Sequence, residues 1–299
     1  MDLSVIIVSY NVSPYLKRCL ESLVKASEGI SSETIVIDNN SSDDSCEMVR
    51  SNFPGVKLIV NEKNIGFSAA CNQGIKVSAG DFILLLNPDT IPEEASLVKC
   101  VGFMRSHVEA GALGARLVNG RGKFLPESKR ALPTPRAAFF RLSGISTLFP
   151  HSGYFNRYYL GDLDEMETNV VEVLTGAFMM IRRKVIETTG LLDEDYFMYG
   201  EDIDMSMRIM KSGFKNYYFP EVTIVHFKGK STAGRSLVSI IHFYRAMLIF
   251  LGKHFRSEYK PYIFPIRIAI YIAAALSLLR RMITIPFTVF FSPGRKENR

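Results

Sequence analysis

Carboxylates beside predicted strands and helices are the side chains of this sequence best suited to carry chemistry. Asp38 ends one predicted strand, Asp89 follows another, and Asp202 lies at the start of a predicted helix. A carboxylate can accept hydrogen bonds from hydroxyl and N–H groups, bind a divalent cation, or remove a proton as a general base. Each also has a structural alternative, because aspartates commonly cap turns and first helical turns.

Apolar runs alternate with helical patterns through the first part of the chain. Strands are predicted over residues 3–9, 34–38, 56–60 and 81–86, with helices between them over residues 13–27, up to about 53, and 66–77. This alternation predicts an α/β fold with a mostly parallel central sheet flanked by helices on both faces. Ligands bind such sheets at the carboxyl ends of the strands, so Asp38 and Asp89 are expected at one rim.

The regular pattern weakens over residues 120–169, which are rich in Pro, Arg, Ser and aromatic residues. We expect this segment to be loop-rich and to face an acceptor. Regular pattern returns with strands over residues 170–174 and 177–181, a helix over 201–211, and strands around Tyr217 and Ile224.

Composition narrows the class of protein. The 299 residues carry 36 Lys and Arg against 30 Asp and Glu, so the net charge of +6 suits an anionic partner. The four cysteines show no CxxC pairing, and we expect reduced, buried thiols in a cytosolic protein rather than disulfides or a zinc site. No secretory signal is expected, because the apolar run at residues 3–8 has no positive region before it.

Short motifs spread over about residues 3–235 resemble the family 2 glycosyltransferases, and among them the bacterial rhamnosyltransferase-like members. The motifs are residues 5–11 (VIIVSYN), 36–43 (VIDNNSSD), 64–74 (NIGFSAACNQG), 85–89 (LLNPD), 175–178 (TGAF), 193–197 (DEDYF) with 200–204 (GEDID), and 226–231 (HFKGKS). The resemblance implies a GT-A fold and transfer of a sugar from a nucleotide-diphosphate donor.

The resemblance implies that strand ends form the donor site. Asp38 corresponds to the residue with which the family recognises the nucleoside, and Ser9, Tyr10 and Asn11 would line the same pocket. The alternatives are a turn cap for Asp38 and ordinary packing for Tyr10.

A second set of donor-binding residues comes from the following helix. Asn64, Gly66 and Asn72 resemble the family pattern in which the glycine lets the backbone approach the donor and the asparagine amide faces the nucleotide. An ordinary helix start is the alternative, and it is compatible with phosphate approach.

The metal site implied by the resemblance contains a substitution. The family usually has Asp-x-Asp, whereas this chain has Asn87-Pro88-Asp89, which leaves Asp89 as the candidate ligand for Mg²⁺ or Mn²⁺ and Asn87 on the donor side. His226 resembles a later metal-side histidine of the family. A structural histidine is the alternative, because a lone His after an apolar strand is commonly structural.

The resemblance assigns the general base of an inverting transfer to Asp202, in a Glu201-Asp202 motif. Its position at a helix start would favour the ionised form. Arg208, six residues on, would face the anionic donor or lie on the helix surface. The alternative for the acidic group is simple capping of the first helical turn.

The C-terminal region differs in character from the rest. A helix is predicted over residues 237–251, and residues 263–291 are apolar but interrupted by Arg267, Arg280 and Arg281. These charges leave roughly a dozen uncharged residues between them, fewer than the roughly 20 of a membrane span. We expect peripheral attachment to the cytoplasmic face of a membrane. The alternatives are a buried helix or a homodimer interface.

These observations combine into one prediction. Residues 1–235 are expected to form the GT-A domain, with a donor half (1–119) and an acceptor and catalytic half (120–235), and residues 236–299 a helical, membrane-peripheral region. The expected enzyme moves rhamnose or another hexose onto a glycan or lipid-linked acceptor in cell-surface polysaccharide synthesis. The rival is a noncatalytic protein of the same fold that binds nucleotide sugars. No motif supports nucleic-acid binding.

Overall fold

The protein is described here by a computed structural model that covers residues 1–229, 237–255 and 262–290. The chain divides into two compact units, Met1–Ser231 and Thr232–Arg299. Each unit is described by itself.

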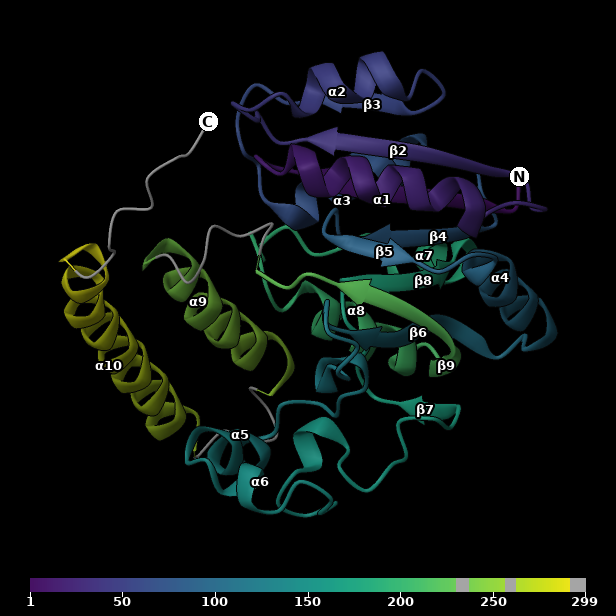
Figure 1. The fold of residues 1–299 in the computed structure, drawn as a ribbon. Coiled ribbons are helices and arrows are strands. Elements are labelled where there is room, and N and C mark those ends of the chain that lie inside the picture. The colour runs from purple at the N-terminus through teal and green to yellow at the C-terminus, as the bar shows by residue number, and fades with distance from the viewer. Residues whose placement is uncertain (230–236, 256–261, 291–299) are drawn as a thin grey trace. The chain divides into compact units, whose positions relative to one another are not determined.

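One mixed β-sheet organises the first unit (Figure 1). Its strands are β1 (Leu3–Ser9), β2 (Ser32–Asp38), β3 (Lys57–Val60), β4 (Phe82–Leu86), β5 (Thr90–Pro92), β6 (Ala110–Val118), β7 (Asn169–Val171), β8 (Phe178–Arg182) and β9 (Lys215–His226). Within the described residues the order is β3-β2-β1-β4-β8-β6-β9-β5, and β7 also pairs with β9. Strands β3, β2, β1, β4, β6 and β9 run in one direction, because β8 is antiparallel to both β4 and β6. The sheet is therefore mostly parallel, as predicted.

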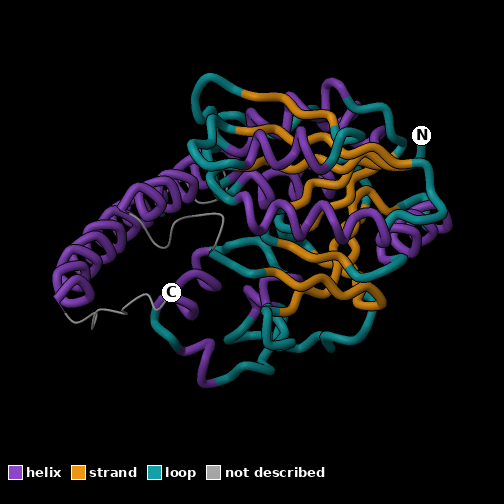
Figure 2. Tube along the Cα trace, turned by 45° about the horizontal axis from the view of Figure 1, so that its top comes forward, coloured by secondary structure: helices purple, strands orange, loops and turns teal. Residues whose placement is uncertain are grey.

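Helices cover both faces of this sheet, and Figure 2 shows the strands between them. The helices are α1 (Ser13–Ala26), α2 (Ser45–Asn52), α3 (Phe67–Val77), α4 (Ser96–Ser106), α7 (Arg183–Thr189) and α8 (Glu201–Lys211). Side chains of α1, α2 and α4 share one core with Val5 and Ile7, and side chains of α3, α7 and α8 share the other with Ile6. Successive β1 residues thus enter opposite cores, as strand geometry requires.

The first unit contains elements that the sequence did not predict, among them β5 and α7. Helix α4 and strand β6 lie in residues 96–118, where no element was predicted. The strands predicted around Tyr217 and Ile224 form one strand, β9, whose register with β6 shifts between Ala115 and Arg116. Pro220 lies in the shifted part of β9, and proline in a sheet is tolerated at such irregularities.

Residues 120–169 contain short helices joined by turns. They are α5 (Pro135–Leu142), α6 (Ile145–Leu148) and the 3₁₀ turns Pro126–Ser128 and Arg157–Tyr159. Thr134 caps α5 by accepting a hydrogen bond from the N–H of Ala137. The segment is loop-rich, as expected.

All four cysteines carry free thiols. Cys19, Cys71 and Cys100 are buried, and Cys46 is half-buried.

The second unit contains the helices α9 (Leu237–His254) and α10 (Ile263–Phe290). The hydroxyl groups of Tyr244 and Ser277 join the two helices at 2.7 Å. Residues Ile263–Ile283 form a helix that is long and apolar enough to cross a membrane by length and composition. The continuous helix runs through the arginines that we expected to break such a span, so crossing is an alternative to peripheral attachment.

Candidate active site

The carboxyl edge of the sheet gathers residues from four strands. Ser9 and Asp38 are paired in register at the ends of β1 and β2, Asn87 follows β4, and His226 ends β9. Because β1, β2, β4 and β9 run in the same direction, these residues share one edge. The rim expected from the sequence is present.

Asp38 is buried and its carboxylate closes the turn after β2. The backbone N–H of Ser41 donates to Oδ2 at 2.8 Å, and the Ser41 hydroxyl donates to Oδ1 at 2.6 Å. The turn-cap alternative therefore occurs in the structure. A carboxylate has about four acceptor positions, so these bonds leave room for a nucleoside contact.

The end of β1 packs against the same turn. Asn11 adopts a left-handed backbone with φ of 55° and accepts hydrogen bonds from the N–H and hydroxyl of Ser42. Tyr10 is 44% exposed, which leaves its ring available to a ligand. The hydroxyl of Ser9 is buried and makes no hydrogen bond within the described residues.

Asp89 and His226 meet where β5 pairs with β9. The Oδ1 atom of Asp89 lies 3.4 Å from Nε2 of His226, and both side chains are nearly inaccessible. Phe227 donates its backbone N–H to the Asp89 carbonyl at 2.9 Å, which fixes the two chain segments together. Nδ1 of His226 is buried without a hydrogen-bond partner among the described residues.

This pair has the chemistry of a partial metal site. One carboxylate and one imidazole suit Mn²⁺ or Mg²⁺ only if other oxygen ligands complete the shell. Within the described residues no group of three or more His, Cys, Asp or Glu side chains could hold a metal. Donor phosphates and water would have to provide the remaining ligands.

Gly66 begins α3 at a position that no other residue suits. Its φ is +89°, and an added Cβ would lie 2.6 Å from the carbonyl oxygen of Phe197. Asn64 accepts the Gly66 N–H at 3.0 Å, and Phe67 donates its N–H to the same Phe197 carbonyl. The glycine therefore provides close approach to the segment before α8.

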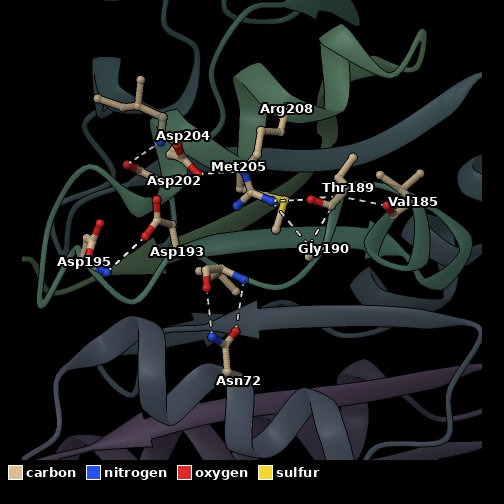
Figure 3. Close-up of polar contacts among 12 residues, drawn as sticks. Asn72, Val185, Thr189, Gly190, Asp193, Asp195, Asp202, Asp204, Met205 and Arg208 are labelled. Atoms are coloured by element: carbon tan, nitrogen blue, oxygen red, sulfur yellow. Dashed lines mark hydrogen bonds and ion pairs between the residues drawn. The ribbon is translucent and has the colours of Figure 1, made fainter. Parts of the chain in front are cut away.

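Asn72 connects α3 to the same segment. Its amide donates to the carbonyl of Leu192 and accepts the N–H of Leu192 (Figure 3). The amide also donates to the Glu194 carboxylate. The amide is buried in these contacts. They hold residues 192–194 in place, while the expected contact with a nucleotide stays a prediction.

Asp202 lies in the first turn of α8 and forms an ion pair with Arg130. Nη2 of Arg130 lies 2.5 Å from Oδ2 of Asp202 and also donates to the Leu174 carbonyl at 2.8 Å. The side chains are 10% and 14% exposed. Burial alone would lower the pKa of Arg130, but the negative charge of Asp202 raises it overall, so the guanidinium stays charged.

A tight turn connects Asp202 to the end of β4. The N–H of Gly176 approaches Asp202 Oδ2 at 3.3 Å, and the carbonyl of Ala177 accepts the N–H of Asn87 at 3.0 Å. Antiparallel pairing of β8 with β4 places this turn beside the end of β4, since Phe178 is opposite Leu86. Residues 176–177 thus contact both Asp202 and Asn87.

Glu201 is a second acid in this cluster. Burial, reinforced by the negative charge of Asp202, raises the pKa of Glu201 to about 8. Its Oε2 atom has no hydrogen-bond partner within the described residues. At neutral pH Glu201 is therefore mainly protonated, and the cluster carries less negative charge than the sequence indicates.

Arg208 is held by contacts within the protein and does not point only into solvent. Its Nε donates to Asp204 at 2.7 Å and its Nη1 donates to the carbonyl of Thr189 at 2.8 Å (Figure 3). These bonds tie α8 to the end of α7. A contact with the donor stays a prediction.

Two groups of this site were missed in the sequence. Arg130 lies in the segment without periodicity, and no local pattern distinguishes it from a surface arginine. Asn39, buried beside Asp38, donates to the Gly66 carbonyl at 3.1 Å and accepts from Asn61. The Asn-rich turn after Asp38 was the signal that could have identified Asn39.

Comparison with known proteins identifies the family of this chain. A family model described as glycosyl transferase family 2 matches residues 4–190. The chain is 28% identical over 261 residues to the N-acetylglucosaminyl-diphospho-decaprenol L-rhamnosyltransferase of Mycobacterium tuberculosis, with 84% of each chain covered.

Solved structures show the same fold at low identity. The mannosyltransferase PcManGT from Pyrobaculum calidifontis, in complex with GDP-Man and Mn²⁺, aligns with a TM-score of 0.57 at 15% identity, over 98% of this chain and 76% of that one. S. aureus TarS aligns with a TM-score of 0.55 at 17% identity, over 85% of this chain and 39% of that one. The GT-A type predicted from the sequence is confirmed.

Proposed function

We propose that this chain transfers a sugar with inversion from a nucleotide-diphosphate donor, because it belongs to glycosyl transferase family 2 and is a glycosyltransferase. The acceptor would be a hydroxyl of a glycan or lipid-linked saccharide in cell-surface polysaccharide synthesis. The sugar would be rhamnose or another hexose, since the M. tuberculosis relative is named a rhamnosyltransferase. The observation that carries this proposal is the position of the Asp202 carboxylate, which contacts the turn at residues 176–177 beside the end of β4.

Asp202 would act as the general base. Its Oδ2 atom accepts hydrogen bonds from Arg130 and Gly176, which orient the carboxylate without protonating it. As the acceptor oxygen forms its bond to the anomeric carbon, the bond from that carbon to the phosphate oxygen breaks. The hydroxyl proton passes to Asp202, and the nucleoside diphosphate leaves with the electron pair.

A protonated Glu201 would limit the negative charge beside the proposed base. A second ionised carboxylate next to Asp202 would repel the negative charge that develops on the leaving diphosphate. With its pKa raised to about 8, Glu201 is mainly neutral at pH 7, while Arg130 balances the charge of Asp202.

The donor would bind along the carboxyl edge. Asp38 would accept a hydrogen bond from the nucleoside, with Tyr10 offering a ring face to the base. Ser9, Asn11, Asn64 and Asn87 would contribute polar contacts. Gly66 and Asn72 would support this site through their contacts with residues 192–197, and Arg208 would add positive charge.

Asp89 and His226 would hold a divalent cation together with the donor phosphates. The Nε2 atom of His226, which lies 3.4 Å from Asp89 Oδ1, and the Asp89 carboxylate would suit Mn²⁺ or Mg²⁺ in this arrangement. When bound, such a cation supplies Lewis-acid neutralisation of the diphosphate charge.

We also propose that the enzyme works at the cytoplasmic face of a membrane, where a lipid-linked acceptor is available. The apolar face of α10 supports attachment, because Phe264, Tyr271 and Leu276 are exposed. A homodimer through the same helices is the alternative.

A donor panel tests the proposal. Thermal stabilisation is measured with dTDP-, UDP- and GDP-sugars, each with Mg²⁺, with Mn²⁺ or with chelator. A cognate donor is expected to stabilise the protein in the presence of metal, and the enzyme should then release nucleoside diphosphate. Stabilisation without any transfer or hydrolysis would favour the noncatalytic alternative. The variants Asp89→Asn and His226→Gln should weaken metal-dependent stabilisation but leave the metal-independent part intact.

A further inference from the structure

An exposed aromatic cluster covers the surface formed by α5, α6 and the turn after them. Phe139, Leu148, Phe149 and Tyr154 are 61%, 74%, 49% and 52% exposed. Ring contacts make the cluster continuous: Phe140 lies 5.7 Å from Phe139 and 5.6 Å from Tyr154, and Phe155 lies 4.9 Å from Phe149. Contiguous exposed apolar side chains of this kind mark interaction surfaces.

The segment that carries this cluster has charges of one sign, although the exposed Asp162 carboxylate lies against Gly153, next to Tyr154. No Asp or Glu occurs between Glu127 and Asp162, whereas five Lys and Arg residues do: Lys129, Arg130, Arg136, Arg141 and Arg157. Three of these are engaged within the unit. Lys129 donates to backbone carbonyls, and Arg130 and Arg157 form ion pairs with Asp202 and Glu172.

The other two arginines lie against aromatic rings. The Arg136 guanidinium is 4.6 Å from the Tyr154 ring centroid, and that of Arg141 is 4.6 Å from the Tyr158 ring centroid. Neither forms an ion pair with a carboxylate among the described residues. Their charges thus remain available to an anionic partner while the rings hold their orientation.

We propose that this aromatic–arginine surface (Phe139, Leu148, Phe149, Tyr154, Arg136 and Arg141) docks the catalytic unit on an anionic lipid bilayer. Aromatic side chains favour the headgroup level of a bilayer, and each nearby cation adds attraction to anionic lipid. A symmetric contact between two copies would bring the same cations together, which disfavours a homodimer through this surface. The proposal is independent of the attachment proposed for α10, because it rests on residues of the first unit.

A single introduced tryptophan tests this surface apart from α10. The chain has no tryptophan, so Phe149→Trp in the full chain reports on this position alone. Vesicles that contain phosphatidylglycerol are expected to shift the emission to shorter wavelength, and brominated lipid to quench it. Phosphatidylcholine vesicles should produce a much smaller change. Val108→Trp is the control, since Val108 is 74% exposed and lies outside the surface; its emission should not change.

Charge variants in the same background test the cationic part. Arg136→Gln with Arg141→Gln should abolish most of the emission shift, whereas Arg121→Gln with Lys123→Gln, which removes two exposed cations elsewhere, should preserve it. Cosedimentation without an emission shift would overturn the proposal and assign binding to α10. Short-wavelength emission before vesicles are added would also overturn the proposal. If that emission depends on protein concentration, a second copy of the chain covers the surface. If it does not, the chain itself covers the surface.

Discussion

Asp202 shares its surroundings with one cation, Arg130, and one neutralised acid, Glu201. The ion pair couples the proposed base to a segment 72 residues away in the sequence. Removing one member of such a pair leaves the other charge poorly solvated, whereas removing both leaves none. The base and the segment that carries Arg130 are therefore expected to be energetically coupled.

A double-mutant cycle measures this coupling. Asp202→Asn should lower transfer by roughly 10²–10⁴-fold because the base is lost. Arg130→Met should destabilise the fold by about 3 kcal/mol, and the double variant should be less destabilised than the sum of the two changes. Chemical unfolding and initial rates give both quantities.

The pair of Lys228 and Glu127, in which the Lys228 side chain is 63% exposed, is the control for this cycle. Lys228→Met should cost less than Arg130→Met, because the cation that it removes is well solvated. Strict additivity between Arg130→Met and Asp202→Asn would contradict the coupling.

Glu201 makes stability depend on pH. Its pKa is raised from the usual value near 4.5 to about 8, so between these values the folded protein binds more protons than the unfolded chain. The free energy of unfolding contributed by this group is therefore greatest below about pH 4.5 and falls as pH rises toward 8, by up to about 1.4 kcal/mol per pH unit. Glu201→Gln should remove this slope, so the variant gains stability relative to wild type as pH rises.

Urea unfolding between acidic and mildly alkaline pH checks this prediction. Glu187→Gln, at an exposed position of α7, should follow the wild-type curve. A constant difference between Glu201→Gln and wild type across the range would show that Glu201 titrates normally.

At the scale of elements, the start of α3 supports the start of α8. Gly66 approaches Phe197 closely, and Asn72 binds residues 192 and 194, so the start and the middle of α3 hold the segment that leads into Asp202. Tyr199 and Gly200 in that segment both have positive φ. The approach to α8 is thus held by contacts rather than by its own preferred conformation.

Gly66→Ala is predicted to disturb both stability and transfer. The added Cβ would meet the Phe197 carbonyl at 2.6 Å and would also strain the backbone at φ of +89°. Gly29→Ala is a matched control, because its φ is +98° with no atom within 4 Å of the added Cβ. Gly29→Ala should cost about 1–2 kcal/mol with unchanged kcat.

Gly66→Ala should destabilise the fold more than Gly29→Ala does. The kcat of Gly66→Ala should also fall, because residues 193–200 move. Thermal unfolding and steady-state kinetics compare the two variants. Equal destabilisation with equal kcat would show that the Phe197 contact has no influence on the site.

At the scale of the whole molecule, two units have different roles in the proposal. The first unit carries the transfer site, and the second carries α10, whose exposed apolar side chains are unusual for a surface in water. A peripherally attached protein and a protein that crosses the membrane differ in the treatment that releases them from the membrane.

Alkaline carbonate extraction of membranes from cells that express the full chain separates these alternatives. Peripheral attachment predicts release into the supernatant together with a known peripheral protein. Retention with an integral marker would mean that α10 crosses the bilayer.

Much of the fold followed from local pattern. The predicted strands over residues 3–9, 34–38, 56–60 and 81–86 correspond to β1–β4. The continuous apolar runs of β1 and β4 are typical of strands buried on both faces. The family and the GT-A fold were likewise evident in motifs at strand ends. Strand β6 was missed because its small residues, as in Gly111 and Gly114, lack that apolar signature.

The aspartates 38, 89 and 202 could be selected from sequence, because residue type and position at the end of an element are local properties. Their surroundings depended on tertiary structure. Antiparallel β8, inserted beside β4, carries residues 176–177 to the edge where Asn87 lies, and Arg130 reaches Asp202 from a segment without periodicity. Contacts between distant segments depend on how the chain packs, and burial set by that packing raises the pKa of Glu201. Local sequence therefore determined which groups are present, and packing decided their partners and charge.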